Sequence, residues 1–125
     1  MPAFETLQAW RIVADAAAVD VVVASTSTTL RFAADDALVL SADRPAVNDE
    51  HAIIEPDAGW SGTWYTTDAF ERTVRHLIEW DVPANGLGQG LVAGVPSKVW
   101  TGDPGLVLIA CPTAYVHELA DRLPS

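Results

Sequence analysis

Three side chains that could ligate a metal ion lie within one short stretch of the chain: His51, Glu55 and Asp57. With their neighbours Asp49 and Glu50 they offer imidazole and carboxylate groups, which bind divalent ions. A bound ion would then activate water for hydrolysis. The spacing matches neither the H-E-x-x-H helix of zinc proteases nor an EF-hand loop. A metal-dependent enzyme and a solvated surface loop therefore both stay open, and the spacing favours the loop.

The single cysteine, Cys111, is the candidate nucleophile. It ends an apolar run, where a thiol is typically buried and inert. The histidines His76 and His117 lie beside Arg72 and Glu118 in predicted helices, so we expect both at the surface. No serine lies in a G-x-S-x-G nucleophile elbow. The sequence does not supply a base, a nucleophile and an oxyanion site together, and we expect no cofactor.

The segment NGLGQGLVAG, residues 85–94, contains four glycines. A phosphate-binding glycine loop must lead into a helix, whose N-terminal amides hold the anion. Here VPSKVW follows, and its proline and β-branched residues indicate a strand instead. The spacing also fits neither common phosphate motif. We therefore expect a mobile connection between helix and sheet, in which Gly88 and Gly90 are candidates for a flap over a binding groove.

Five tryptophans are many for a chain of 125 residues, and two of them frame a glycine. Trp60, Gly62 and Trp64 alternate onto one face of a predicted strand, so Gly62 leaves a gap between two large rings. That gap could accept a peptide or small ligand. The alternative is that a helix covers the gap and buries both indoles, which the usual burial of aromatic side chains favours.

Acidic residues outnumber basic ones by 17 to 7, giving a net charge of −10. Such a field repels phosphate backbones, so nucleic acid and anionic membranes are poor partners. Residues 35–68 hold eight of the acids and one base, Arg44. This stretch would suit a basic protein or peptide, although a merely solvated surface is the simpler interpretation.

Length and composition predict one globular domain over residues 1–125. One cysteine excludes an internal disulfide, the first residues lack a secretory pattern, and no apolar run is long enough to span a bilayer. We therefore expect a cytoplasmic protein.

The apolar periodicity predicts a helix over residues 3–18 and leaves 19–25 undecided between helix and strand. Short β-prone runs at 29–34 and 37–42 predict a hairpin, and 43–51 a polar loop.

A strand is predicted from residue 60. A second helix is predicted over residues 68–79, with Asp68 or a nearby threonine as its cap. The runs at 93–100 and 106–111 flank a turn at 101–105 and predict a second hairpin. The run at 106–111 is apolar on both faces, which predicts a central strand. A last helix follows after Thr113.

The predicted order is α-β-β-β-α-β-β-α, an α+β fold with an antiparallel sheet of about five strands and helices packed mainly on one face. This order resembles the secretion-chaperone-like fold of type III secretion chaperones and YbjN-type proteins. The resemblance implies a small acidic protein that binds partner segments, often as a dimer. Our leading hypothesis is a non-catalytic peptide-binding chaperone or adaptor. The alternatives are an enzyme using His51, Glu55 and Asp57, or an accessory subunit that exposes an apolar face.

Overall fold

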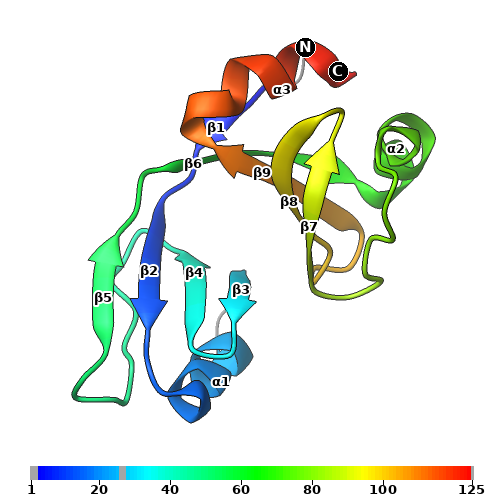
Figure 1. Cartoon of the computed structure of the whole chain (residues 1–125). Helices are drawn as coiled ribbons and strands as arrows, with labels where there is room; N and C mark the ends of the chain where they lie inside the picture. Colours follow the sequence, from blue (N-terminus) through cyan, green and yellow to red (C-terminus); the bar gives the residue numbers. More distant parts are fainter. Residues whose placement is uncertain (1–2, 26–27, 125) are drawn as a thin grey trace. The chain divides into compact units, whose positions relative to one another are not determined.

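The computed structural model describes residues 3–25 and 28–124, which form two compact units (Figure 1). The larger unit consists of Met1–Leu7 and Gly59–Ser125, and the smaller unit of Gln8–Ala58. Each unit contains one antiparallel sheet and at least one helix, so the predicted α+β class is confirmed. Within the described residues, no helix has the length and apolar character needed to cross a bilayer.

The larger unit is built on a five-stranded sheet with the order β1-β6-β9-β8-β7. Its elements are β1 (Glu5–Thr6), β6 (Trp60–Thr66), α2 (Thr67–Thr73), η1 (Arg75–Leu77), β7 (Leu87–Val92), β8 (Val95–Trp100), β9 (Leu106–Pro112), η2 (Thr113–Tyr115) and α3 (Val116–Arg122). All neighbouring strands are antiparallel. The apolar run predicted as a central strand is β9, which pairs with β6 on one side and β8 on the other.

The helical segments of the larger unit pack on one face of this sheet, as predicted. Phe70 and Val74 from the α2 region and Leu119 from α3 are fully or almost fully buried against it. The sheet contributes alternate residues of its strands to the same core, among them Ile109 and Cys111 of β9. The opposite face of the sheet carries none of this helical layer.

The smaller unit has a four-stranded sheet with the order β3-β4-β2-β5 and one helix. Its elements are β2 (Ala9–Val13), α1 (Ala16–Ser25), β3 (Thr29–Ala33), β4 (Asp36–Leu40) and β5 (Ile53–Pro56). Val19 and Val22 of α1 pack on Ile12, Ala37 and Val39 of the sheet. This unit therefore has an apolar core of its own.

The predicted opening helix over residues 3–18 is wrong. Residues 9–13 form β2, which pairs with β4 and with β5, and α1 begins only at Ala16. Strand pairing on both sides satisfies the backbone of Trp10 to Val13 and outweighs the helical spacing of the apolar residues. The undecided residues 19–25 are the continuation of α1.

Most other elements agree with the sequence predictions in kind. Both hairpins form, β3 with β4 and β8 with β9. The second helix is shorter than predicted, because α2 ends at Thr73 and only the 3-10 turn η1 follows. Its cap is Thr66, whose hydroxyl accepts from the amide of Ala69 at 3.1 Å. Thr113 does not cap α3, since its hydroxyl instead bonds that of Ser61 at 3.0 Å.

The glycine-rich segment is a strand, not the mobile connection we expected. Residues 87–92 form β7 at the edge of the sheet, paired with β8 through a turn at Ala93 and Gly94, both with positive φ. The glycines serve packing, because Trp80 lies against them. A Cβ atom on Gly88 would come within 2.6 Å of the Trp80 ring, and one on Gly90 within 2.5 Å of its indole nitrogen.

We predict that Gly90→Ala lowers the free energy of unfolding by about 1–3 kcal/mol, because the added methyl group displaces Trp80. The displacement would also strain the 2.9 Å hydrogen bond from Trp80 Nε1 to the carbonyl oxygen of Leu91. Urea unfolding followed by tryptophan fluorescence would measure the loss. In a Trp80→Ala background the same substitution should cost little, since glycine is itself unfavourable in a strand. Equal costs in both backgrounds would contradict this account.

Candidate functional site

The predicted metal ligands are not brought together. The His51 side chain is 87% exposed, and its Nε2 atom lies 3.4 Å from Glu50 Oε1. Glu55 is in β5 opposite Arg11, and the amide of Asp57 donates to the carbonyl of Ala9 at 2.9 Å. Among residues 3–25 and 28–124, no three His, Cys, Asp or Glu side chains are placed to hold a metal ion.

The carboxylates around this loop interact with the chain's own donors. Asp36 forms a bidentate pair with Arg11 and is the main cause of the raised pKa of that guanidinium, to which the charge of Asp57 adds. Asp49 accepts from the amide of Asp15 at 2.8 Å and from that of His51 at 2.9 Å, and these bonds lower its pKa. Asp49 thus ties the polar loop to the start of α1.

Cys111 is buried on the helical side of the larger sheet. Burial raises the pKa of its thiol to about 11. A neutral, enclosed thiol is a poor nucleophile, so the structure supports a packing role for this side chain.

The helix-free face of the larger sheet presents the side chains that alternate with those of the core. Trp60 and Trp64 of β6 and Lys98 of β8 lie on this face, because their strand neighbours Tyr65 and Val99 point into the helical layer. The alternative in which a helix covers this strand and buries both indoles therefore does not hold. Trp64 is 43% exposed and Trp60 is half-buried.

The gap at Gly62, however, is closed. A Cβ atom there would lie 2.9 Å from Leu108 Cδ1 and 3.2 Å from Leu7 Cδ2, so two leucines of the same unit fill the space between the indoles. Trp64 packs edge to face with Trp100, with ring centroids 6.0 Å apart. The space directly beside Gly62 is thus filled, although Gly62 and Trp64 contribute to the lining of a cavity of about 570 Å³ that also includes Arg72. A second cavity lies at the Trp60 end of the face.

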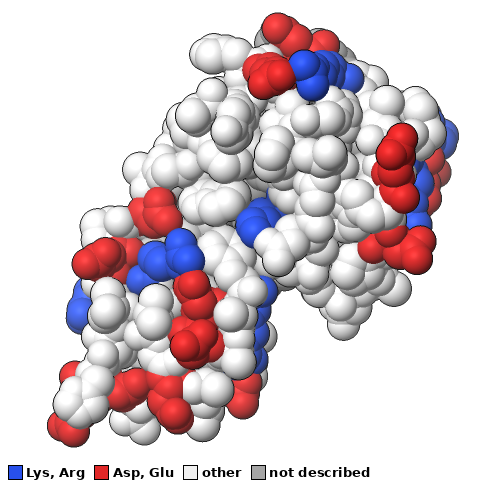
Figure 2. Space-filling model, viewed as in Figure 1, with Lys and Arg blue, Asp and Glu red and all other residues white. Residues whose placement is uncertain are grey.

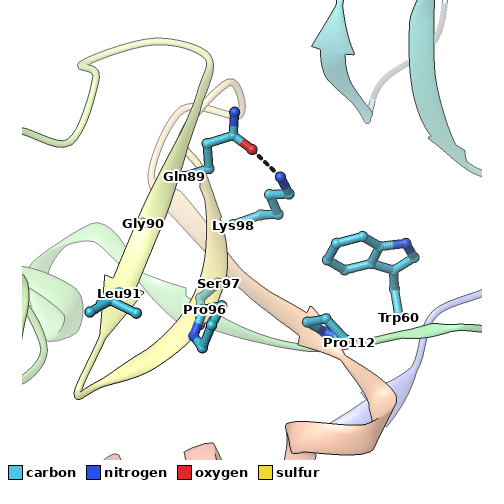
Figure 3. Close-up of a pocket in the computed structure, with 8 residues that line it drawn as sticks. All are labelled: Trp60, Gln89, Gly90, Leu91, Pro96, Ser97, Lys98 and Pro112. Carbon is cyan, nitrogen blue, oxygen red and sulfur yellow. Dashed lines mark hydrogen bonds between the residues drawn. The ribbon is translucent and has the colours of Figure 1, made fainter.

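A pocket of about 350 Å³ lies at that end (Figure 3). Its lining comes from four strands of the larger sheet: Trp60, Gln89, Gly90, Leu91, Pro96, Ser97, Lys98 and Pro112. Most of the surface is apolar, formed by the indole, two proline rings and Leu91, which is 55% exposed. An exposed apolar hollow of this kind marks an interaction site.

The charged group in the pocket is Lys98, the single lysine of the chain. Its Nζ lies 5.8 Å from the centroid of the Trp60 ring, a cation-π geometry, and donates to Gln89 Oε1. Figure 3 shows the lysine and the indole projecting into the same space. The eight lining residues include no Asp or Glu.

The arginines form ion pairs within each unit. In the described residues, five of the six make ion pairs with carboxylates of their own unit: Arg11 with Asp36, Arg31 with Asp20, Arg72 with Asp68, Arg75 with Glu71, and Arg122 with Glu118. Figure 2 shows blue and red groups next to one another on the face in view. The exposed arginine pairs contribute little to stability individually. Lys98 shares the lining of its pocket with apolar side chains.

The predicted flap residues serve this pocket only in part. Gly88 is buried against Trp80 on the helical side, whereas Gly90 also contributes to the pocket lining. Sequence reasoning missed Leu91, Pro96 and Pro112. The signal that could have found them is the pairing of β7, β8 and β9, which places these side chains on the same face as Trp60.

No family model matches the sequence, and no curated protein matches it. A chain of the heterotetrameric sarcosine oxidase from Corynebacterium sp. U-96, solved in complex with pyrrole 2-carboxylate, has a similar fold. The TM-score is 0.70 at 13% sequence identity, over 93% of this chain and 76% of that chain. The fold is therefore one that also occurs in a chain of a multi-subunit enzyme.

We predict that replacing Asp49 with Asn destabilises the smaller unit at neutral pH. A carboxylate whose pKa is lowered by folding contributes stability that is present above its unfolded pKa and lost as the pH falls through its folded pKa. The difference from wild type should therefore shrink as the solution is acidified. Urea unfolding followed by circular dichroism at a series of pH values would measure it. Asp43→Asn, at an exposed position of the same loop, is the matched control and should show no such trend.

We also predict that Cys111 in the folded protein reacts with Ellman's reagent at pH 8 at least about a hundredfold more slowly than an ordinary thiol. The raised pKa lowers the thiolate fraction, and burial excludes the reagent. The reaction rate in denaturant is the control and should be normal. Rapid reaction without denaturant would show that the thiol is accessible.

Proposed function

We propose that this chain is a non-catalytic, protein-binding subunit of a larger assembly, and that it contacts its partner through the helix-free face of the larger sheet around the Trp60 pocket. The observation that carries the proposal is the exposure of Leu91 and Trp64 on this face, next to two prolines and a half-buried indole. Aromatic residues are enriched in protein interfaces and often provide their binding energy.

The distribution of charge supports the same face as an interface. Interface cores are depleted of charged residues. Among the residues that line the pocket, the exposed side chains are apolar apart from Lys98 and Gln89. The acidic residues of the larger unit that form ion pairs, such as Asp68 and Glu118, belong to the helices, which pack on the other side of the sheet.

The fold comparison agrees with an accessory subunit. The similar chain belongs to a heterotetrameric oxidase, so this architecture occurs in a protein that assembles with others. The chaperone or adaptor hypothesis predicts the same mode of contact with a partner segment. A metal-dependent reaction at His51, Glu55 and Asp57 gains no such support, because the structure does not bring these side chains together.

We predict that Leu91→Ser weakens binding of the physiological partner by about tenfold, since a buried leucine contributes at least that much to an interface. Ile53→Ser is the matched control, because Ile53 is about as exposed as Leu91 but belongs to β5 of the smaller unit. The partner would be sought among proteins encoded beside this gene by co-expression and affinity purification, with complex size measured by analytical ultracentrifugation.

The proposal requires a stoichiometric complex that Leu91→Ser weakens and Ile53→Ser leaves intact. A dimer of this chain that depends on Leu91 would make the partner a second copy. A wild-type chain that stays monomeric with every candidate, or variants that behave identically, would contradict the proposal.

A further inference from the structure

We infer that the edge of β6 at Trp64 and Thr66 is a strand-addition site, which binds an extended segment of another protein as a further strand of the larger sheet. The segment carries apolar residues that alternate with small polar ones. The site lies beside β1 and shares no lining residue with the Trp60 pocket, so the inference goes beyond the proposed function.

The backbone groups of β6 point alternately toward its two neighbouring strands. The carbonyl oxygen of Trp60 accepts from the amide of Leu7 at 2.8 Å, so the backbone of Trp60 points toward the β1 side. Because hydrogen-bonding groups alternate along an antiparallel strand, Gly62, Trp64 and Thr66 present their amides to the same side. The intervening residues bond to β9.

The strand β1 is too short to pair with the whole of this edge. Within the part of the chain that the structure describes, β6 has ladder partners on the β1 side only at Ser61 and Gly62. The amides of Trp64 and Thr66 and the carbonyl oxygen of Trp64 are therefore left outside the ladder. Donors and acceptors at this spacing match the backbone of another extended segment, which would continue the ladder that β1 begins.

The opposite edge of the larger sheet is covered. Trp80 Nε1 donates to the carbonyl oxygen of Leu91 at 2.9 Å, and the amide of Ala93 donates to the carbonyl oxygen of Leu77 at 3.1 Å. These bonds occupy outward backbone groups of β7 and of the turn that follows it. Proteins commonly cover edge strands in this way, because an open edge recruits other strands. No described side chain covers the corresponding amides of β6.

The side chains around the edge indicate what the added segment contains. A cavity of about 570 Å³ lies against the edge, with lining residues from β6 and α2 and from the chain around β1. A residue paired with Trp64 would lie on the helix-free face beside that exposed indole, which suits an apolar side chain. Its neighbours would point toward Thr63 and Thr73, whose hydroxyl groups suit small polar side chains.

N-methylated peptides test whether the backbone is recognised. The probe is a blocked hexapeptide of alternating threonine and valine, added at millimolar concentration to the ¹⁵N-labelled full chain. We expect it to shift the amide resonances of Trp64 and Thr66 and to slow their hydrogen exchange. Methylating the valine nitrogens, which would face β6, should weaken binding about tenfold, whereas methylating the threonine nitrogens should leave it unchanged.

Two substitutions of Thr66 isolate one amide of the protein. Thr66 has φ −67°, a value that proline adopts, so Thr66→Pro removes the outward amide without removing a bond to β9. Thr66→Ala is the matched control, because both substitutions remove the hydroxyl that caps α2 and only proline removes the amide. We expect the peptide to bind Thr66→Pro about fivefold more weakly than Thr66→Ala. Leu91→Ser should not change peptide binding, since Leu91 lies outside this groove.

Three outcomes would overturn the inference. Equal binding of the two methylated peptides would show that the backbone is not recognised. Failure of the unmethylated peptide to protect either amide would exclude strand addition at this edge. A wild-type dimer that Thr66→Pro abolishes, measured by analytical ultracentrifugation, would assign the edge to a second copy of the chain. None of these outcomes bears on the Trp60 pocket, which the Leu91 and Ile53 variants test separately.

Discussion

The central position of β9 determines which side chains of the larger unit are buried and which reach solvent. β9 pairs with β6 on one side and β8 on the other. Its register therefore determines which side chains of β6 and β8 point to each face of the sheet. Val107, Ile109 and Cys111 then point into the helical layer. A shift of one residue would exchange the two faces and place the Trp60 pocket inside the core. The helical layer that holds this register is therefore also what keeps the pocket on the surface.

The two faces of one sheet give the tryptophans different roles. Trp80 covers Gly88 and Gly90 on the helical side, where the absence of side chains lets the indole lie against the strand backbone. Trp60 lies on the other side, next to Lys98 and the prolines. The glycines of β7 are thus explained by the packing of Trp80. The pocket lies on the opposite face, which the helices of this unit do not cover.

Much of the larger unit could be predicted from the sequence, because its signals are local. The turn at residues 101–105 and the apolar run after it predict a hairpin with a central strand, as observed. The opening helix failed for a physical reason: Trp10 to Val13 are extended because β4 and β5 pair with them, and β5 lies some forty residues further along the chain. The resemblance to secretion chaperones and the single-domain organisation stay predictions.

The candidate site was only partly predictable for the same reason. Trp60 could be identified from strand alternation, whereas Leu91, Pro96 and Pro112 come together only through the pairing of three strands. The acid-rich stretch was visible in composition, but Asp36 and Asp49 proved to bind an arginine and backbone amides of the smaller unit. Composition gives the number of charged residues in a chain. Which of these charges are available to a partner depends on the ion pairs and hydrogen bonds that the folded chain forms within itself.

The larger unit is discontinuous in sequence, since β1 precedes the smaller unit and pairs with β6 after it. During synthesis on the ribosome, Gln8–Ala58 is complete before any residue of β6 has been made. The inserted segment can therefore collapse early around its own apolar core, before the strand β6 that pairs with β1 has been synthesised. Joining the two ends of the larger unit requires closure across the whole insertion, a long-range contact of the kind that slows folding.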